Sequence, residues 1–443
     1  MKIELAGHYD SRKLLKTMWP SVLMMLTTSL YSIIDGWFVS NYAGKTALAA
    51  INLVSPIIMI AASLGLVVGA GGTALVSKTL GEGHLQKASH IFSQLIEFTI
   101  IGGILFSILG FIFAEEIVFH CKASGLLLYN SIFYFRCMMT SLTAFMLQMA
   151  FHSLFMTAEK PQMGMILSWI SCATNIVLDT VLVAWMDWGL AGAAYATIIS
   201  QLIGGLYPII YFLSPRNTAR LKLQPVRWQF RTIIQTCTNG LSEFIGNIAF
   251  SIASICYNLQ LLRYCGEDGV AAFGVLMYIS FFFSSVFIGF NITVSPLIGF
   301  NYGAQNYTEL KSLLRKCIIL TTGIGIAIAL FSELLRFPLA GLFVGYNPPL
   351  MQLTTHAFRI YMPCFALVGF NMFVSAFFTS LGNGLISAFA AFMRSIVFEI
   401  SSVFLLPIYL GTDGIWWSAC VAEGLSCITA ISLLITFKTR YRY

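Results

Sequence analysis

The sequence predicts an all-α integral membrane protein with twelve transmembrane helices arranged in two lobes of six. Three observations predict this fold class. Hydrophobic residues make up 58% of the 443 residues and charged residues only 10%, whereas soluble domains carry ~25% charged residues. The mean hydropathy is +0.82. Apolar runs of the ~20 residues that a membrane helix needs recur along the chain, and the period-2 alternation of a membrane β-barrel is absent.

Each predicted span is an apolar run of membrane-crossing length that ends at a polar connection. The N-terminal stretch "MKIELAGHYDSRKLLK" is polar and amphipathic and leads directly into the first span, so we expect no cleavable signal peptide. The predicted spans are, in order, residues 17–41, 50–77, 90–113, 127–156, 164–185, 192–213, 234–262, 270–300, 317–336, 353–381, 386–410 and 414–436.

The distribution of Lys and Arg predicts a multi-pass protein of the cell (inner) membrane with both termini in the cytoplasm. Of the 25 Lys and Arg residues, only Lys45, Lys122, Arg263 and Arg336 fall in the outer loops of this topology. The net charge of +7 therefore reflects topology, and no nucleic-acid partner is expected because the basic residues are spread over several loops. The predicted inner side carries Lys2, Arg12, Lys13, Lys16, Lys78, Lys87, Lys160, Arg216, Arg220, Lys222, Arg227, Arg231, Lys311, Arg315, Lys316, Lys438, Arg440 and Arg442.

A polar stretch in the middle of the chain divides six predicted spans from six. The stretch "SPRNTARLKLQPVRWQFR" carries five basic residues and no acidic residue. It predicts a basic cytoplasmic linker at residues 214–232 between an N-terminal lobe at 1–213 and a C-terminal lobe at 233–443. The second lobe ends in a short basic cytoplasmic tail.

The two lobes resemble each other in sequence. An offset of 222 residues aligns "GKTALAAINLV" with "GEDGVAAFGVL" and Gly81 with Gly303, and one residue more aligns Arg136 with Arg359. An even number of spans in each lobe inserts both lobes the same way up, related by a pseudo-two-fold axis along the membrane normal. Parallel repeats of this kind are a known transporter construction.

Four polar residues fall at a similar depth in three spans of the first lobe. Asp35 lies about six residues, or ~9 Å, below the predicted outer surface. Asn175 and Asp179 in "NIVLD" share one face of the fifth span at spacing i, i+4, and Thr197 in the sixth span lies at a similar depth. A buried carboxylate must be paired, coordinated or protonated, and hard oxygen ligands suit a small hard cation or a proton. We therefore predict a cation-binding site at these four residues.

These motifs resemble those of the multidrug and toxic compound extrusion (MATE) transporters. "IIDGWFVSNYAGKTALAA" is similar to the first-span signature of that family, and "NIVLD" is similar to its fifth-span motif. The resemblance implies that Asp35, Asn175, Asp179 and Thr197 line a cavity implicated in sodium or proton binding. Members of the family frequently have a Glu in the seventh span, and the resemblance implies that Glu243 in "NGLSEFIGN" corresponds to it. His152 in the fourth span is a departure, because the resemblance implies Asn there.

Further charged residues lie inside the predicted spans of the second lobe, where each costs ~2.5–3.5 kcal/mol to bury. Glu243, Glu399 and Glu423 fall near the middle of spans seven, eleven and twelve. We interpret Arg394 as half of a structural ion pair with Glu399 or Glu423. Glu243 is the stronger candidate for coupling or substrate binding, because its own helix carries no basic residue nearby. His152, Glu399 and Glu423 are further candidates.

The predicted function is secondary active multidrug efflux, not an enzyme activity. We expect antiport of lipophilic organic cations against H⁺ or Na⁺ by alternating access, with no other cofactor. The 37 Phe and 18 Met residues suit such substrates, and His152 would favour H⁺ if it pointed into the cavity. The alternatives are a flippase or exporter of a lipid-linked saccharide or other amphipathic metabolite, and a membrane enzyme or channel, for which no HExxH or GxSxG motif occurs. We expect a monomer whose partner is the lipid bilayer.

Overall fold

The structure is a computed structural model of the chain and describes residues 4–121, 124–215, 217–345 and 347–443. Helix accounts for 89% of it, and these ranges contain no strand. Lys2, Lys122 and Arg216, which the topology prediction uses, lie outside the described residues. The elements in chain order are α1 (Ser11–Phe38), η1 (Val39–Ala43), α2 (Lys45–Gly81), α3 (Leu85–Ile112), α4 (Ala114–His120), α5 (Gly125–Thr157), α6 (Pro161–Leu178), η2 (Asp179–Trp185), α7 (Gly189–Leu213), α8 (Phe230–Gly303), α9 (Tyr307–Leu334), α10 (Arg336–Val344), α11 (Pro348–Tyr361), η3 (Met362–Cys364), α12 (Phe365–Ser380), α13 (Gly384–Phe392), η4 (Met393–Phe398), α14 (Glu399–Leu410) and α15 (Thr412–Tyr441).

Ten helical segments among the described residues are long and apolar enough to cross a bilayer, so the number twelve stays a prediction. Two features account for the difference. The run α8 counts once, although Gly266, with φ 67° and ψ −153°, separates two helices within it. The 33-residue helix α5 is not among the ten, since polar residues such as Asn130 and Arg136 lower its hydropathy.

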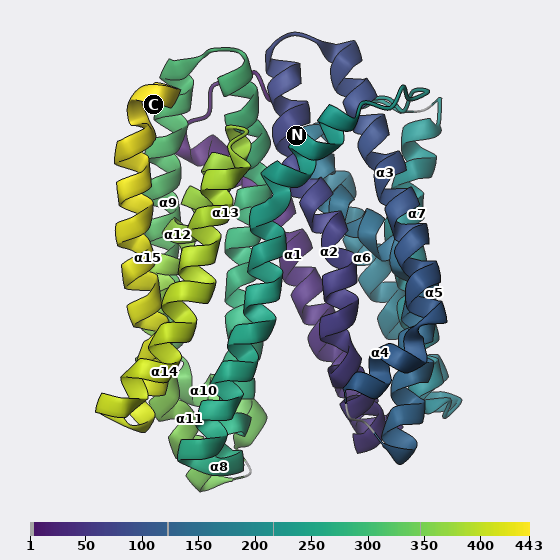
Figure 1. Cartoon of the computed structure of the whole chain (residues 1–443), viewed down its shortest axis with the longest axis vertical. Coiled ribbons are helices and arrows are strands. Elements are labelled where there is room, and N and C mark those ends of the chain that lie inside the picture. Colours follow the sequence, from purple (N-terminus) through teal and green to yellow (C-terminus); the bar gives the residue numbers. More distant parts are fainter. Residues whose placement is uncertain (1–3, 122–123, 216, 346) are drawn as a thin grey trace.

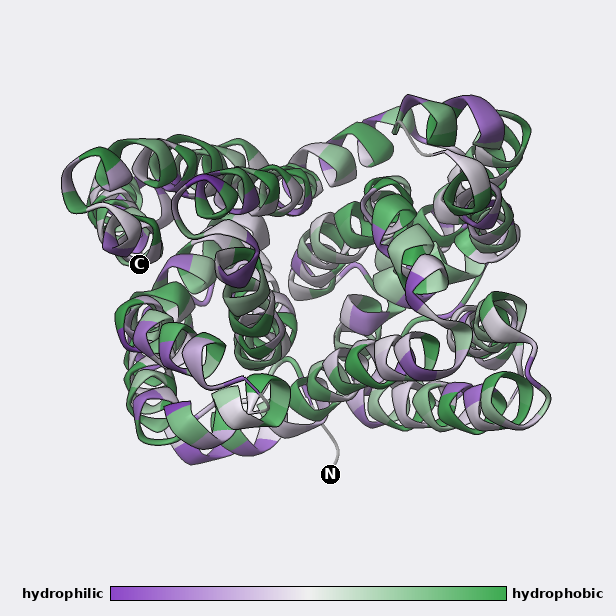
Figure 2. Ribbon diagram, turned by 90° about the horizontal axis from the view of Figure 1, so that it is seen from below, coloured by the Kyte–Doolittle hydropathy of each residue, from purple (hydrophilic) through white to green (hydrophobic). Residues whose placement is uncertain are grey.

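The helices form two groups that correspond to the two halves of the sequence. Figure 1 shows α2–α7 on one side and α9–α15 on the other, with α1 and α8 running between them. The groups converge at the end that carries both termini and diverge toward the other end. Seen along the helices, hydrophobic residues are distributed over both groups (Figure 2). Many large hydrophobic side chains are exposed, and such a surface is suited to contact with lipid chains.

The two halves meet in a reciprocal contact at the end that carries the termini. Gly81 at the end of α2 lies against the backbone of Phe300 in α8, and Gly303 at the end of α8 lies against the backbone of Lys78 in α2. A Cβ atom at either glycine would clash with that backbone. Lys78 and Phe300 are 222 residues apart in the sequence, and so are Gly81 and Gly303. A two-fold relation between the halves predicts this reciprocity.

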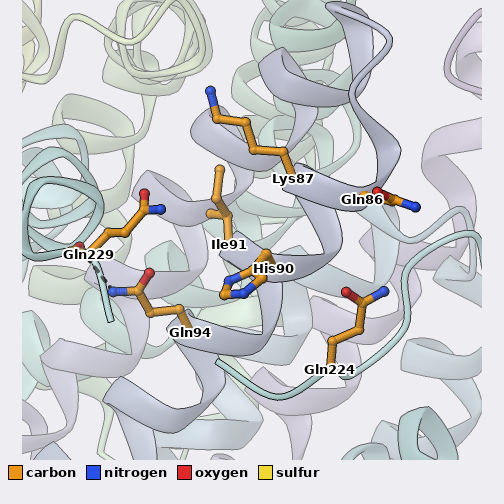
Figure 3. A pocket seen from close by; sticks show the side chains of 7 residues that line it. All are labelled: Gln86, Lys87, His90, Ile91, Gln94, Gln224 and Gln229. Carbon is orange, nitrogen blue, oxygen red and sulfur yellow. Dashed lines mark hydrogen bonds between the residues drawn. The ribbon is translucent and has the colours of Figure 1, made fainter. Parts of the chain in front are cut away.

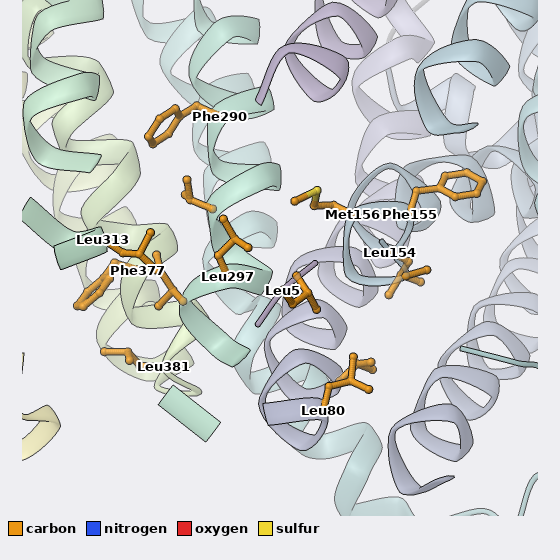
Figure 4. Packing of buried hydrophobic residues seen from close by; sticks show 14 of the residues in the cluster. Leu5, Leu80, Leu154, Phe155, Met156, Phe290, Leu297, Leu313, Phe377 and Leu381 are labelled. Atoms are coloured by element: carbon orange, nitrogen blue, oxygen red, sulfur yellow. The ribbon is translucent and has the colours of Figure 1, made fainter. Parts of the chain in front are cut away.

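The buried hydrophobic residues form three clusters, and one of them joins the halves. The joining cluster includes Leu80 and Leu154 of the first half, Leu297 and Phe377 of the second, and Leu5 of the N-terminal segment between them (Figure 4). The other two clusters each belong to one half and lie toward the opposite end of the molecule. Apolar burial therefore holds the halves together mainly at the end that carries the termini.

Candidate functional site

Two carboxyl groups from different helices meet inside the first half. Asp35 lies in α1, and Asp179 is the first residue of the π-helical turn η2 that follows α6. The two side chains lie within hydrogen-bonding reach of each other. Oδ1 of Asp35 and both carboxyl oxygens of Asp179 receive no hydrogen bond from other described residues, and no described Lys, Arg or His forms an ion pair with either. Such a pair requires a proton or a bound cation to offset the repulsion.

The amide and the hydroxyl predicted for this site are also buried without partners. Asn175 lies one helical turn before Asp179 on α6, and its side chain is fully buried. Its Oδ1 and Nδ2 atoms have no hydrogen-bond partner among the described residues, and neither has Oγ1 of Thr197 on α7. Buried polar atoms are nearly always paired with protein groups, water or an ion. The unpartnered oxygens therefore indicate a ligand or water site.

Two tyrosines complete the site and were missed by sequence reasoning. Tyr31 lies one turn before Asp35 on α1, near Thr197 and Ser200 of α7 and near the carboxyl pair. Tyr134 on α5 is buried close to the same pair. The i, i+4 spacing from Tyr31 to Asp35 is a signal that could have identified Tyr31. No spacing in the sequence relates Tyr134 to the two acids, because only the packing of α5 places it beside them.

Irregular helix accompanies the buried ionisable groups in both halves. η1 begins shortly after Asp35, η2 begins at Asp179, and η4 contains Arg394 and ends just before Glu399. π-helical turns interrupt the regular i to i−4 hydrogen bonds and occur frequently at functional sites. These ionisable side chains therefore lie where the regular backbone hydrogen bonding of the helix is interrupted.

His152 lies far from the carboxyl pair. It is buried near the C-terminal end of α5, and its Nε2 atom has no hydrogen-bond partner among the described residues. Tyr134, which does lie near the pair, is on the same helix about 27 Å away at 1.5 Å per residue. The structure therefore does not support a contribution of His152 to this cavity. The sequence located His152 on a neighbouring helix, but its depth places it toward the end that carries the termini.

A second buried charged cluster occupies the other half. Nη2 and Nε of Arg394 donate to Oε1 of Glu423, at 2.7 Å and 2.8 Å. Nδ2 of Asn371 donates to Oε2 of the same carboxylate at 2.6 Å and to the backbone oxygen of Glu423 at 2.9 Å. Glu423 is thus the ion-pair partner of Arg394, and its carboxylate is satisfied within the protein. This arrangement fits a structural role better than substrate binding.

The remaining two candidate glutamates have different surroundings. Glu399 lies close enough to Arg394 to interact electrostatically, and it lies near the buried Tyr257 and Tyr361. It forms no ion pair within 4.0 Å among the described residues. Glu243 is exposed, and it shares a face of α8 with Asn247, whose Nδ2 donates to the backbone oxygen of Met59 in α2. Glu243 therefore lies near the contact between the halves, apart from Glu399.

Known proteins share the fold of this chain. The sequence model of the MatE family matches residues 20–181 and 244–405, one segment in each half. The chain belongs to the MatE family. Relatives of this MatE protein include the multidrug export protein MepA of Staphylococcus saprophyticus subsp. saprophyticus, 25% identical over 99% of this chain and 98% of the relative. MepA of Staphylococcus haemolyticus is 24% identical over 99% and 97%.

Solved structures of MATE proteins have the same fold. A MATE protein crystallised with MaL6 has a TM-score of 0.93 at 21% identity, with coverage of 99% of this chain and 98% of that one. A multidrug resistance MATE transporter in an outward-facing conformation has a TM-score of 0.92 at 22% identity and the same coverage. The two segments matched by the MatE model are of equal length and are offset by nearly the spacing of the sequence repeat. Members of the MatE family are transporters.

Combined substitutions will test whether the four first-half residues act as one site. We expect Asn175→Ala and Asp179→Asn each to weaken cation-dependent transport. Added to Asp35→Asn, neither should lower the rate further, because residues that act as a unit are strongly non-additive. The measurement is the initial rate of substrate transport in vesicles containing equal amounts of each variant. Losses that multiply in the double variants would show independent roles and contradict a single site.

Proposed function

We propose that this MatE protein exports lipophilic organic cations in antiport with a proton, by alternating access between its two halves. The observation that carries the proposal is the pair of Asp35 with the fully buried Asp179, which has no basic partner among the described residues. The names of the MepA relatives, which are multidrug export proteins, support export of several compounds. In the proposed topology the protein crosses the inner membrane twelve times, and both termini lie in the cytoplasm.

The proposed coupling follows from the chemistry of the carboxyl pair. Two carboxylates in contact cannot both stay ionised in a poorly solvated site, so taking up one proton relieves their repulsion. A proton changes the balance between two conformations only as far as its affinity for them differs. The π-helical turns η1 and η2, which adjoin Asp35 and Asp179, are the elements that we propose change with protonation. A change in these two turns would give the two conformations different affinities for a proton.

The arrangement of the halves supports an alternating-access mechanism. One hydrophobic cluster joins the halves at the end that carries the termini, whereas the clusters toward the other end are confined to single halves. In the proposed topology this conformation is closed on the cytoplasmic side. Opening on that side would break the contacts of Gly81 and Gly303, which are close approaches of backbone to backbone.

The accessible glutamate supports cationic substrates. Glu243 is exposed on the face of α8 that contacts α2, and no described basic residue pairs with it. A carboxylate between the halves would attract an organic cation, and aromatic and thioether side chains would contact its apolar part. A flippase for a lipid-linked saccharide remains the alternative. That substrate carries phosphate, which a carboxylate at this position would repel.

Sodium is the alternative coupling ion. The unpartnered oxygens of Asp35, Asn175, Asp179 and Thr197 are hard ligands of the kind that Na⁺ takes. Direct contact between the two carboxyl groups is what a shared proton requires, and this favours H⁺.

An ion-gradient experiment distinguishes the two ions. In proteoliposomes with an imposed pH gradient and no sodium, we expect transport of ethidium to continue and to stop when the gradient is collapsed. Vesicles containing Asp179→Asn protein serve as the control and should show no response to the gradient. Transport that needs a sodium gradient and ignores pH would overturn the proton assignment and make the four residues a sodium site.

A further inference from the structure

Two helices at equivalent places in the repeat each hold an irregular segment. α3 (Leu85–Ile112) and α9 (Tyr307–Leu334) are both 28 residues long, and their first and last residues are each 222 positions apart (85 to 307, 112 to 334). The segment that precedes α1 lies on the first turns of α9. The linker that precedes α8 lies on the first turns of α3. Each segment therefore crosses to a helix of the other half.

On α9, charged side chains of the protein itself hold the N-terminal segment. Oε1 of Glu309 accepts a hydrogen bond from the backbone nitrogen of Tyr9 at 3.1 Å, and Oε2 of Glu309 lies 2.6 Å from Nδ1 of His8. Nζ of Lys316, two turns further along α9, donates to the backbone oxygen of Tyr9 at 2.5 Å. Tyr9 is fully buried as a result.

On α3 the equivalent contacts are made without charge. Nε2 of Gln94, the residue equivalent to Lys316, donates to the backbone oxygen of Gln229 at 3.0 Å (Figure 3). Oγ of Ser93 accepts from the backbone nitrogen of Gln224 at 2.9 Å. Lys87 stands at the position equivalent to Glu309 (87 to 309), so the charge there is reversed. Among the described residues Lys87 forms no ion pair, and the linker sequence 214–231 contains no acid that would pair with it.

A cavity remains where this charged contact is missing. Its volume is about 440 Å³, and it opens between the start of α3 and the linker. Figure 3 shows the amide, imidazole and ammonium groups of its lining. Glu82 and Glu97, the nearest carboxylates along α3 and its preceding turn, do not line it. The polar lining residues are Gln86, Lys87, His90, Gln94, Gln224 and Gln229.

The cavity lies beside surface that suits lipid chains. Phe230 follows Gln229 directly and is 76% exposed, and Ile234, one turn later on the same face of α8, is 65% exposed. Trp228 is also exposed, and aromatic residues of this kind concentrate at membrane interfaces. The exposed basic side chains of Arg227 and Arg231 flank the segment. A ligand with a phosphate in the cavity could therefore extend its apolar part along α8.

We propose that this cavity binds the headgroup of an anionic phospholipid from the leaflet at the end that carries the termini. The phosphate would face Lys87 and His90, and the amides of Gln86, Gln94 and Gln224 would donate hydrogen bonds to the headgroup oxygens. The lipid supplies the negative charge that Glu309 supplies on α9, and so ties the linker to α3. Basic pockets between helices at the cytoplasmic side are suited to anionic headgroups.

The test measures lipid retention on the full-length protein. The purified protein is incubated with phosphatidylglycerol or phosphatidylcholine, and the bound lipid is counted by native mass spectrometry. We expect the wild type to retain phosphatidylglycerol preferentially, and Lys87→Gln to reduce this retention roughly fivefold, which corresponds to ~1 kcal/mol per basic residue near an anionic surface. His90→Gln should lower it as well. Lys311→Gln, which removes an exposed charge near the start of α9, is the matched control and should change nothing.

Three outcomes would overturn the proposal. Equal losses in Lys87→Gln and Lys311→Gln would show general surface attraction. Displacement of the lipid by inorganic phosphate alone would show a free-phosphate site. Unchanged retention in Lys87→Gln would show that the cavity binds no headgroup. Thermal unfolding would support the proposal in the following case. In phosphatidylcholine, Lys87→Gln has the same unfolding midpoint as the wild type. Phosphatidylglycerol raises the midpoint of the wild type but not that of Lys87→Gln.

Discussion

Asp35→Asn is expected to lower substrate export by about 5- to 150-fold, the range spanned by a coupling free energy of ~1–3 kcal/mol. The amide keeps the size of the carboxyl group and removes its charge. It also supplies an N–H donor to the oxygens of Asp179, which receive no hydrogen bond from other described residues. The substitution therefore imitates the protonated pair and holds the protein in the conformation that protonation favours.

The measurement is ethidium efflux from cells or vesicles with matched protein levels. Asp187→Asn is the matched control, because Asp187 is exposed and its φ of 52° is one that Asn adopts readily. Its export should equal the wild type. Export by Asp35→Asn at the wild-type rate, in protein that is folded and inserted, would show that Asp35 has only a structural role.

Arg394→Met is expected to destabilise the protein by about 3–5 kcal/mol, the cost of removing one member of a buried ion pair. Glu423 would lose both hydrogen bonds from the guanidinium group and would retain only those from Asn371. Glu399, which also lies near Arg394, would lose its nearest positive charge. Denaturant unfolding in bicelles measures the change in the free energy of unfolding.

Two variants make this second prediction specific. Arg359→Met removes an arginine that is exposed and has no ion pair among the described residues, so its cost should stay within about 0.5 kcal/mol. Adding Glu423→Gln to Arg394→Met should recover much of the lost stability, because no unpaired charge is then left on residue 423. A single Arg394→Met variant as stable as the wild type would contradict the assigned ion pair.

The two halves carry different chemistry at matching positions. At the offset that aligns Arg136 with Arg359, Arg394 corresponds to Ser171 and Glu423 corresponds to Ser200. In the first half, Oγ of Ser171 donates to the backbone oxygen of Ser200 at 2.6 Å. The same helix contact is thus a neutral hydrogen bond in one half and an ion pair in the other. Among the described residues, Glu423 of the second half is paired with Arg394, whereas Asp35 and Asp179 of the first half have no counter-ion.

Much of the candidate site was predictable because it depends on distance along single helices. Hydropathy located the apolar runs, and a rise of 1.5 Å per residue gave the depths of Asp35, Asp179 and Thr197. The i, i+4 spacing placed Asn175 and Asp179 on one face. The structure brings the two carboxyl groups into contact, as these depths imply. Membership of the MatE family, expected from the motifs around Asp35 and Asp179, is also confirmed.

Other features depend on how the helices rotate and tilt against one another, which no spacing in the sequence encodes. From the sequence, either Glu399 or Glu423 could form the ion pair with Arg394. The packing of α15 against η4 places Glu423 in that ion pair. The position of α5 places Tyr134 close to the carboxyl pair. His152 lies on the same helix, but its depth places it far from the pair.

By itself the sequence determined the helical membrane fold, the repeat and the residues that carry the buried acids. Hydrophobicity and helical periodicity are local properties, so they can be read from short stretches of chain. Only the tertiary structure decided that the N-terminal segment lies on α9, that the linker lies on α3, and that a cavity is left beside Lys87. Each of these depends on contacts between residues that are far apart in sequence. Their geometry is set when the two halves pack together, after the local propensities have been satisfied.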